Sequence, residues 1–107
     1  MPDQSRVEAL KEILATNPDD AFARYALGLE YSGAGETDAA LAEFQRLLAA
    51  HPDYTNGYFM AAQALATAGR TDEARGMLHQ GIECASKTRN AHAQSEMQAM
   101  LDELELA

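Results

Sequence analysis

The chain has 107 residues, enough for one domain that buries about 65% of the surface its unfolded form would expose. Seventeen Asp and Glu residues against eight Lys and Arg residues give a formal charge of -9 at pH 7, which argues against nucleic acid as a partner. Tryptophan is absent, while Ala, Leu, Glu, Gln and Met are abundant, a composition typical of a helical protein.

The first predicted helix covers residues 4–16. The side chains that recur there at the spacing of one helix face are Val7, Leu10, Ile13 and Leu14. Ser5 with Glu8 has the pattern of a capping box, which predicts the start of the helix. Asn17 and Pro18 predict its end, because a residue that precedes proline avoids the helical conformation.

The next two helices are predicted at about residues 20–32 and 37–50. One of the aspartates at 19 and 20 can cap the first of them. Gly35 closes it, because glycine adopts a left-handed conformation at no steric cost. Thr37 is expected to cap the second helix. The first helix has two apolar faces, formed by Phe22, Tyr25 and Leu29 and by Leu27 and Tyr31.

A second hairpin follows the same plan, with helices at about 54–68 and 71–85. Gly69 makes the turn and Thr71 is the expected cap. Gly81 weakens the second of these helices, so we expect it to let the following helix approach closely. The other glycine of that helix, at position 76, has no such explanation.

The last helix is predicted for residues 90–105, after a polar break at 86–90. One side of this helix is an apolar stripe that consists of Ala93, Met97, Met100, Leu101 and Leu104. The opposite side is polar, as a terminal capping helix requires.

Several residues recur after 34 positions, which indicates a repeat protein. Pro18, Asp19, Gly35, Thr37, Asp38 and Ala40 return as Pro52, Asp53, Gly69, Thr71, Asp72 and Ala74. A unit of this length holds two short helices, and neither buries its apolar face until neighbouring units stack.

The pattern of residues 21–54 resembles the tetratricopeptide repeat. The matching small and large apolar positions are Leu27, Gly28, Tyr31, Ala40, Phe44, Leu47 and the closing Pro52. Residues 55–88 resemble it more loosely, with Tyr58, Ala62, Ala74 and Leu78 in place but Ser86 instead of the closing proline. In this register, residues 4–16 form the second helix of a truncated repeat.

This resemblance implies an all-α solenoid of antiparallel helix pairs, a right-handed superhelix of about six helices. It also implies a non-catalytic adaptor that binds a peptide segment or a helix of a partner protein in its concave groove. Neither a metal nor a cofactor is expected. The concave residues that the family pattern indicates are Phe22, Tyr25, Leu29, Asn56, Phe59, Gln63 and Met97.

Other uses of these residues remain open. Tyr25, Phe59 and the methionines are core residues if the terminal helix covers them, and the same apolar face could instead pair two copies into a homodimer. Cys84, His79 and His92 do not have the spacing of a metal or nucleophile set. A lone cysteine, no signal peptide and no apolar run of about 20 residues predict a cytoplasmic protein without a membrane span.

Overall fold

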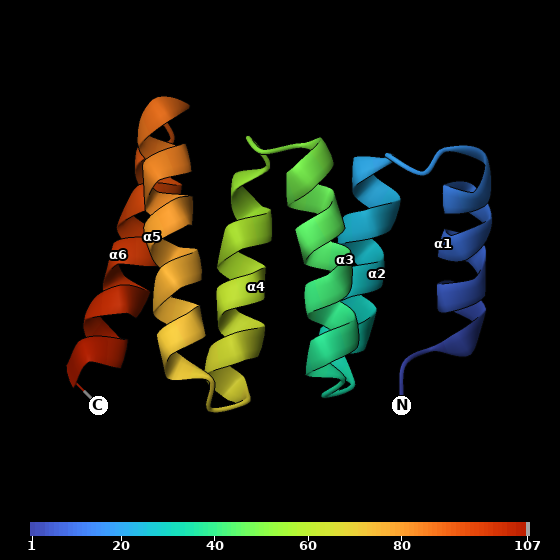
Figure 1. Cartoon of the computed structure of the whole chain (residues 1–107), viewed down its shortest axis with the longest axis horizontal. Helices are drawn as coiled ribbons and strands as arrows, with labels where there is room; N and C mark the ends of the chain where they lie inside the picture. The colour runs from blue at the N-terminus through green and yellow to red at the C-terminus, as the bar shows by residue number, and fades with distance from the viewer. Residues whose placement is uncertain (107) are drawn as a thin grey trace.

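The computed structural model describes residues 1–106 as a row of six α-helices (Figure 1). The helices are α1 Gln4–Thr16, α2 Ala21–Gly33, α3 Thr37–Ala50, α4 Thr55–Thr67, α5 Thr71–Lys87 and α6 Ala91–Leu106. No strand occurs within residues 1–106, so the predicted all-α fold is confirmed. The row is 40 Å long, 29 Å wide and 18 Å deep.

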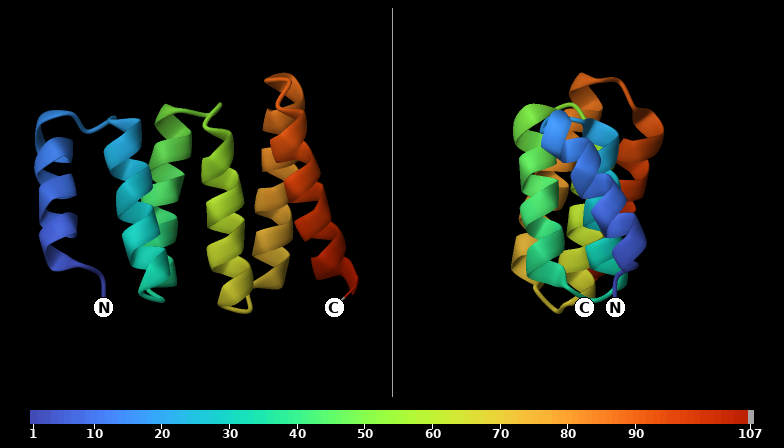
Figure 2. Two further views of the ribbon diagram at one scale, coloured as in Figure 1. Left: turned by 180° about the vertical axis from the view of Figure 1, so that it is seen from behind. Right: turned by 90° about the vertical axis from the view of Figure 1, so that its right-hand side faces the viewer.

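Each helix packs against its neighbours in sequence, and α2 also contacts α4, as α4 contacts α6. Among residues 1–106, α1 does not contact α3, nor α3 contact α5. In Figure 1, α2 lies behind α3 and α6 lies behind α5, and the reverse view in Figure 2 brings α2 and α6 to the front. The helices α2, α4 and α6 therefore form an inner row, and the stack curves around it, as expected for a helical solenoid.

Tight packing between helices depends on two glycines. A Cβ atom on Gly28 of α2 would lie 2.6 Å from Cε1 of Phe44 on α3. A Cβ atom on Gly81 of α5 would lie 2.5 Å from Sδ of Met97 on α6 and 2.7 Å from Cβ of Tyr58 on α4. The expectation that Gly81 allows the following helix to approach is confirmed.

The turns that join the two helices of each hairpin follow the sequence prediction. Gly35 and Gly69 have φ angles of 76° and 78°, the left-handed conformation that glycine accepts best. Asp20 caps α2, because its Oδ1 accepts a 2.8 Å hydrogen bond from the backbone N–H of Ala23.

Three predicted helix caps are wrong. Asp3 rather than Ser5 caps α1, and its Oδ1 accepts a 3.1 Å bond from the backbone N–H of Arg6. Thr37 and Thr71 are the first residues inside α3 and α5, whose cap positions make no side-chain hydrogen bond. In each hairpin one residue separates the left-handed glycine from the helix, so the threonine lies one position too late to act as a cap.

Residues at the same repeat position in the two hairpins hold the preceding loops through hydrogen bonds from different side chains. Arg24 on α2 donates a 2.7 Å bond to the carbonyl of Pro18 and pairs with Glu43 on α3 at 2.8 Å. Tyr58, 34 residues later, donates a 2.8 Å bond to the carbonyl of Pro52. Both bonds fix the loop that leads into the inner helix, so the inner helices of both units enter the stack in the same way.

Candidate functional site

The inner row presents six of the seven residues expected to line a groove. On α2, Phe22 is 68% exposed and Tyr25 and Leu29 are half-buried. On α4, Asn56 and Gln63 are exposed and Phe59 is half-buried. We call these six residues the inner face; they share one side of two helices that are in contact.

Tyr25 and Asn56 join the two helices across this face. Asn56 Nδ2 donates a 2.6 Å hydrogen bond to Tyr25 Oη. The Tyr25 ring lies 5.3 Å from the ring of Tyr54 and 6.3 Å from that of Phe44, measured between ring centroids. Burial raises the pKa of the Tyr25 phenol above its ordinary value of 10.0, so the phenol is neutral at physiological pH. Asn56 thus holds the Tyr25 side chain in position on the inner face.

The floor of the inner face is uncharged. All thirteen residues of α4 are neutral. The one basic side chain of α2, Arg24, is turned toward α3 and held there by Glu43. A surface of this kind favours apolar and neutral hydrogen-bonding groups over a free carboxylate.

Met97 corrects the sequence interpretation. It is 1% exposed and fills the space above Gly81, so the prediction that it lines an open groove is wrong. The start of α4 lies 34 residues after the start of α2, whereas the start of α6 lies 36 residues after that of α4. Without a proline at position 86, α5 continues to Lys87 and shifts the register of the last helix by two residues.

The shifted register identifies the inner-row positions of α6 that sequence reasoning missed. Counted from the first residue of each helix, Met97 corresponds to Leu27 of α2 and Ala61 of α4, all three of them buried. The α6 residues equivalent to the inner-face positions of α2 and α4 are His92, Ser95 and Ala99, and all three are exposed.

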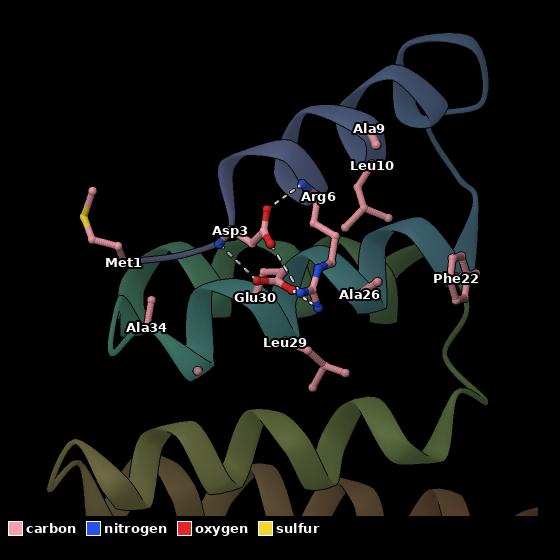
Figure 3. A pocket seen from close by; sticks show the side chains of 11 residues that line it. Met1, Asp3, Arg6, Ala9, Leu10, Phe22, Ala26, Leu29, Glu30 and Ala34 are labelled. Carbon is pink, nitrogen blue, oxygen red and sulfur yellow. Dashed lines mark hydrogen bonds and ion pairs between the residues drawn. The ribbon is translucent and has the colours of Figure 1, made fainter.

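A cleft of about 750 Å³ lies between α1 and α2, beside the inner face (Figure 3). We call it the α1–α2 groove. Figure 3 shows Arg6 reaching from α1 to Glu30 on α2, with an Nη1–Oε1 distance of 3.1 Å. The groove residues are Met1, Asp3, Arg6, Ala9, Leu10, Phe22, Ala26, Leu29, Glu30, Gly33 and Ala34. Phe22 and Leu29 thus belong both to this groove and to the inner face.

Cys84 and the histidines do not form one cluster. Cys84 is buried, with its Sγ 3.5 Å from both Thr55 Oγ1 and the carbonyl of Pro52. His79 is exposed, and His92 pairs with Glu96 at 3.0 Å on the surface of α6. Within residues 1–106, no three His, Cys, Asp or Glu side chains gather as they would to hold a metal ion.

None of the helices in residues 1–106 combines the length and the apolar character needed to span a bilayer.

Comparison with known proteins gives consistent matches. Family models for the tetratricopeptide repeat match residues 31–101 and 2–59. The TPR repeat-containing protein PA0015 of Pseudomonas aeruginosa is 32% identical over 101 residues, covering 94% of this chain and 96% of the relative. A tetratricopeptide repeat domain protein from Salinibacter ruber is 34% identical, with a TM-score of 0.76 over 83% of this chain and 90% of that one.

A more distant structure has the same fold. The TPR2B domain of yeast Sti1, solved in a complex with pHsp70, superimposes with a TM-score of 0.85 at 16% sequence identity. The match covers 94% of this chain and 80% of that one.

Proposed function

Because this chain belongs to the tetratricopeptide repeat family, we propose that it is a non-catalytic protein-interaction module. It binds a peptide segment or a helix of a partner protein on the inner face, with the exposed positions of α6 as the continuation of that surface. The observation that carries this proposal is the uncharged, partly apolar floor that α2 and α4 expose together.

The individual residues support distinct roles in this binding. Phe22 is an apolar anchor at one end of the face, since two thirds of its surface is open to solvent. Phe59 and Tyr25 give a half-buried apolar floor, and Gln63 offers a neutral donor and acceptor to a peptide backbone. The Sti1 domain of the same fold, which forms a complex with pHsp70, makes binding of a polypeptide segment a reasonable use of such a surface.

A second candidate is a homo-oligomerisation module that uses the same surface. It is favoured by Phe22, a large apolar side chain left exposed where a second copy could cover it. Sedimentation equilibrium over a wide concentration range separates the two: a strict monomer favours partner binding, and a concentration-dependent dimer favours self-association. A cytoplasmic location belongs to the proposal and is supported by the unpaired thiol of Cys84.

The test compares two exposed glutamines. Gln63→Arg places a long cation in the middle of the inner face, whereas Gln45→Arg places it on the outer helix α3. Each variant, immobilised beside the wild-type chain, is used to capture partners from an extract of the native cells, followed by mass spectrometry. We expect a partner that wild type and Gln45→Arg retain and that Gln63→Arg loses by about tenfold or more.

Circular dichroism of both variants must match the wild type, so that lost capture reports on the surface and not on folding. If Gln63→Arg retains every partner that Gln45→Arg retains, the inner face is not the binding surface.

A further inference from the structure

The α1–α2 groove repeats, at the start of the stack, a surface that borders α2 in the next unit. Its α2 wall contains Phe22, Ala26, Leu29 and Gly33. The residues 34 positions later on α4 are Asn56, Met60, Gln63 and Thr67. Those α4 residues face α2: the first bonds to Tyr25, the second packs in the cluster around it, and the last two share a cleft with Ser32.

The α1 wall of the groove also has an equivalent in the next unit, on α3. Ala9 and Leu10 lie 34 positions before Glu43 and Phe44 of α3. In α3 both residues are covered by α2, since Arg24 pairs with Glu43 and Gly28 lies against Phe44. At the next position of this face, the residue on α1 is exposed whereas its equivalent on α3 is buried.

Ile13 is 39% exposed on α1, whereas its equivalent on α3, Leu47, is 1% exposed. The α1–α2 groove therefore has the walls of a helix-binding site, but residues 1–106 supply no helix to fill it.

We propose that the α1–α2 groove binds an amphipathic helix of a partner protein, placed against α1 and α2 as α2 is placed against α3 and α4. This binding surface is separate from the proposed peptide-binding role of the inner face, although Phe22 and Leu29 border both.

The helices that fill the equivalent positions define the chemistry of the occupant. Where α2 crosses α3 it presents Gly28 and Tyr31, and where α4 crosses α5 it presents Ala62 and Leu65. Both patterns place a small residue at the closest approach and a large one three positions later. The bound helix therefore carries this small-large pattern on its docking face.

Charge further restricts the occupant. Arg6 is already paired with Glu30 at 3.1 Å and with Asp3 at 3.3 Å, and Ala9 replaces the glutamate that α3 uses to bind Arg24. The docking face of the bound helix is therefore uncharged, since a charge opposite Ala9 would be buried without a partner. Its outer face is basic, because the chain that receives it has a formal charge of -9.

The sequence of α4 supplies a probe with the uncharged small-large docking face, although it carries no basic outer face. In its own position α4 packs Ala62 in a cluster with Leu78, and the residue that corresponds to Leu78 in the groove is Leu10, also a leucine. A labelled peptide of residues 54–68, acetylated and amidated at its ends, is titrated with the full chain and followed by fluorescence anisotropy.

We expect saturable binding that Ala9→Glu weakens by about tenfold or more, because the carboxylate blocks and charges the α1 wall. Ala15→Glu is the matched control: it makes the same exchange at an exposed position of α1 outside the groove, and the affinity should stay within about twofold. In ¹⁵N correlation spectra of the chain, the peptide should shift the amides of Ala9, Ala26 and Gly33.

Three results overturn the proposal: no saturation up to about 1 mM peptide, equal affinity of Ala9→Glu and wild type, or shifted amides confined to α4 and α6. A dimer that forms without peptide and that Ala9→Glu abolishes would also overturn it, since the occupant would then be a second copy. Gln63→Arg separates the two surfaces, because it disrupts the inner face and not the α1–α2 groove. If this variant loses partner capture but still binds the peptide, the groove proposal stands independently of the inner face.

Discussion

Two glycines of α5 lie five residues apart and have different surroundings. A Cβ atom on Gly81 would meet the stem of Tyr58 and the sulfur of Met97, whereas nothing lies within 4 Å of a Cβ atom on Gly76. The methionine side chain can move away, but the Cβ atom of Tyr58 belongs to the stem of its helix, so α4 and α5 would have to separate. The helix thus carries one glycine that packing requires and one that nothing in the structure explains.

Alanine at these two positions should therefore change stability in opposite directions. Gly81→Ala is expected to lower the free energy of unfolding by about 1–3 kcal/mol through overpacking. Gly76→Ala is expected to raise it by about 0.5–1 kcal/mol, because an exposed helical glycine carries a greater entropy cost than alanine. Urea unfolding of both variants measures the two values. A stabilising Gly81→Ala would show that the contact between α4 and α5 is looser than described.

At the scale of the helices, aspartate or asparagine side chains accept bonds at the starts of α1, α2 and α6. Asp3, Asp20 and Asn90 each accept a hydrogen bond from the backbone N–H three residues later. The hydrogen bond from the N–H of Arg6 holds the pKa of Asp3 below its ordinary value of 3.8. Because the folded state lowers this pKa, the stabilisation is present above the ordinary pKa and is lost as the pH falls through the folded value.

Asp3→Ala should consequently destabilise the chain at pH 7 and have a smaller effect at pH 2, because the carboxyl group takes up protons as the pH falls. The measurement is the difference in urea midpoint between variant and wild type at the two pH values. Ser5→Ala is the control, since Ser5 is exposed and does not cap α1. An equal loss at both pH values would mean that Asp3 acts through something other than its charge.

The number of helices and most of their ends could be predicted, because proline and glycine mark those ends physically. Pro18 stops α1, and the left-handed glycines at 35 and 69 close the inner helices. The register of α6 could not be predicted by counting, since it depends on how far α5 continues once no proline stops it. Met97 was misplaced for that reason.

The six residues of the inner face were predicted from the family pattern, and the structure adds their exposure and the bond between Tyr25 and Asn56. The α1–α2 groove could not be predicted in the same way. Its walls come from two helices whose contact is not apparent from either sequence segment, and the exposure of Ile13 is visible only when it is compared with Leu47.

At the scale of the whole molecule, packing is uneven along the row. Within residues 1–106, the central helix α4 contacts α2, α3, α5 and α6, whereas α1 contacts only α2. In a stack of this kind each element is stabilised mainly by its nearest neighbours. The ends of the row therefore open at a lower free energy than its centre.

Hydrogen exchange followed by mass spectrometry should show this order. Peptides from α1 are expected to exchange fastest among the helices, and those from α4 slowest. Addition of the peptide of residues 54–68 should slow exchange in α1 if that helix gains a second neighbour. Uniform exchange along the chain would instead indicate that all six helices unfold as one cooperative unit.

In the part of the chain that the structure describes, contacts between alternate helices occur only along the inner row, which gives the stack an unequal resistance to bending. Curling it more tightly would press α2 against α4 and α4 against α6, pairs of helices that are already in contact. Flattening it would stretch the bond between Tyr25 and Asn56, but no outer helix would obstruct the movement. We therefore expect the stack to flatten around a bulky partner more readily than it curls around a slender one.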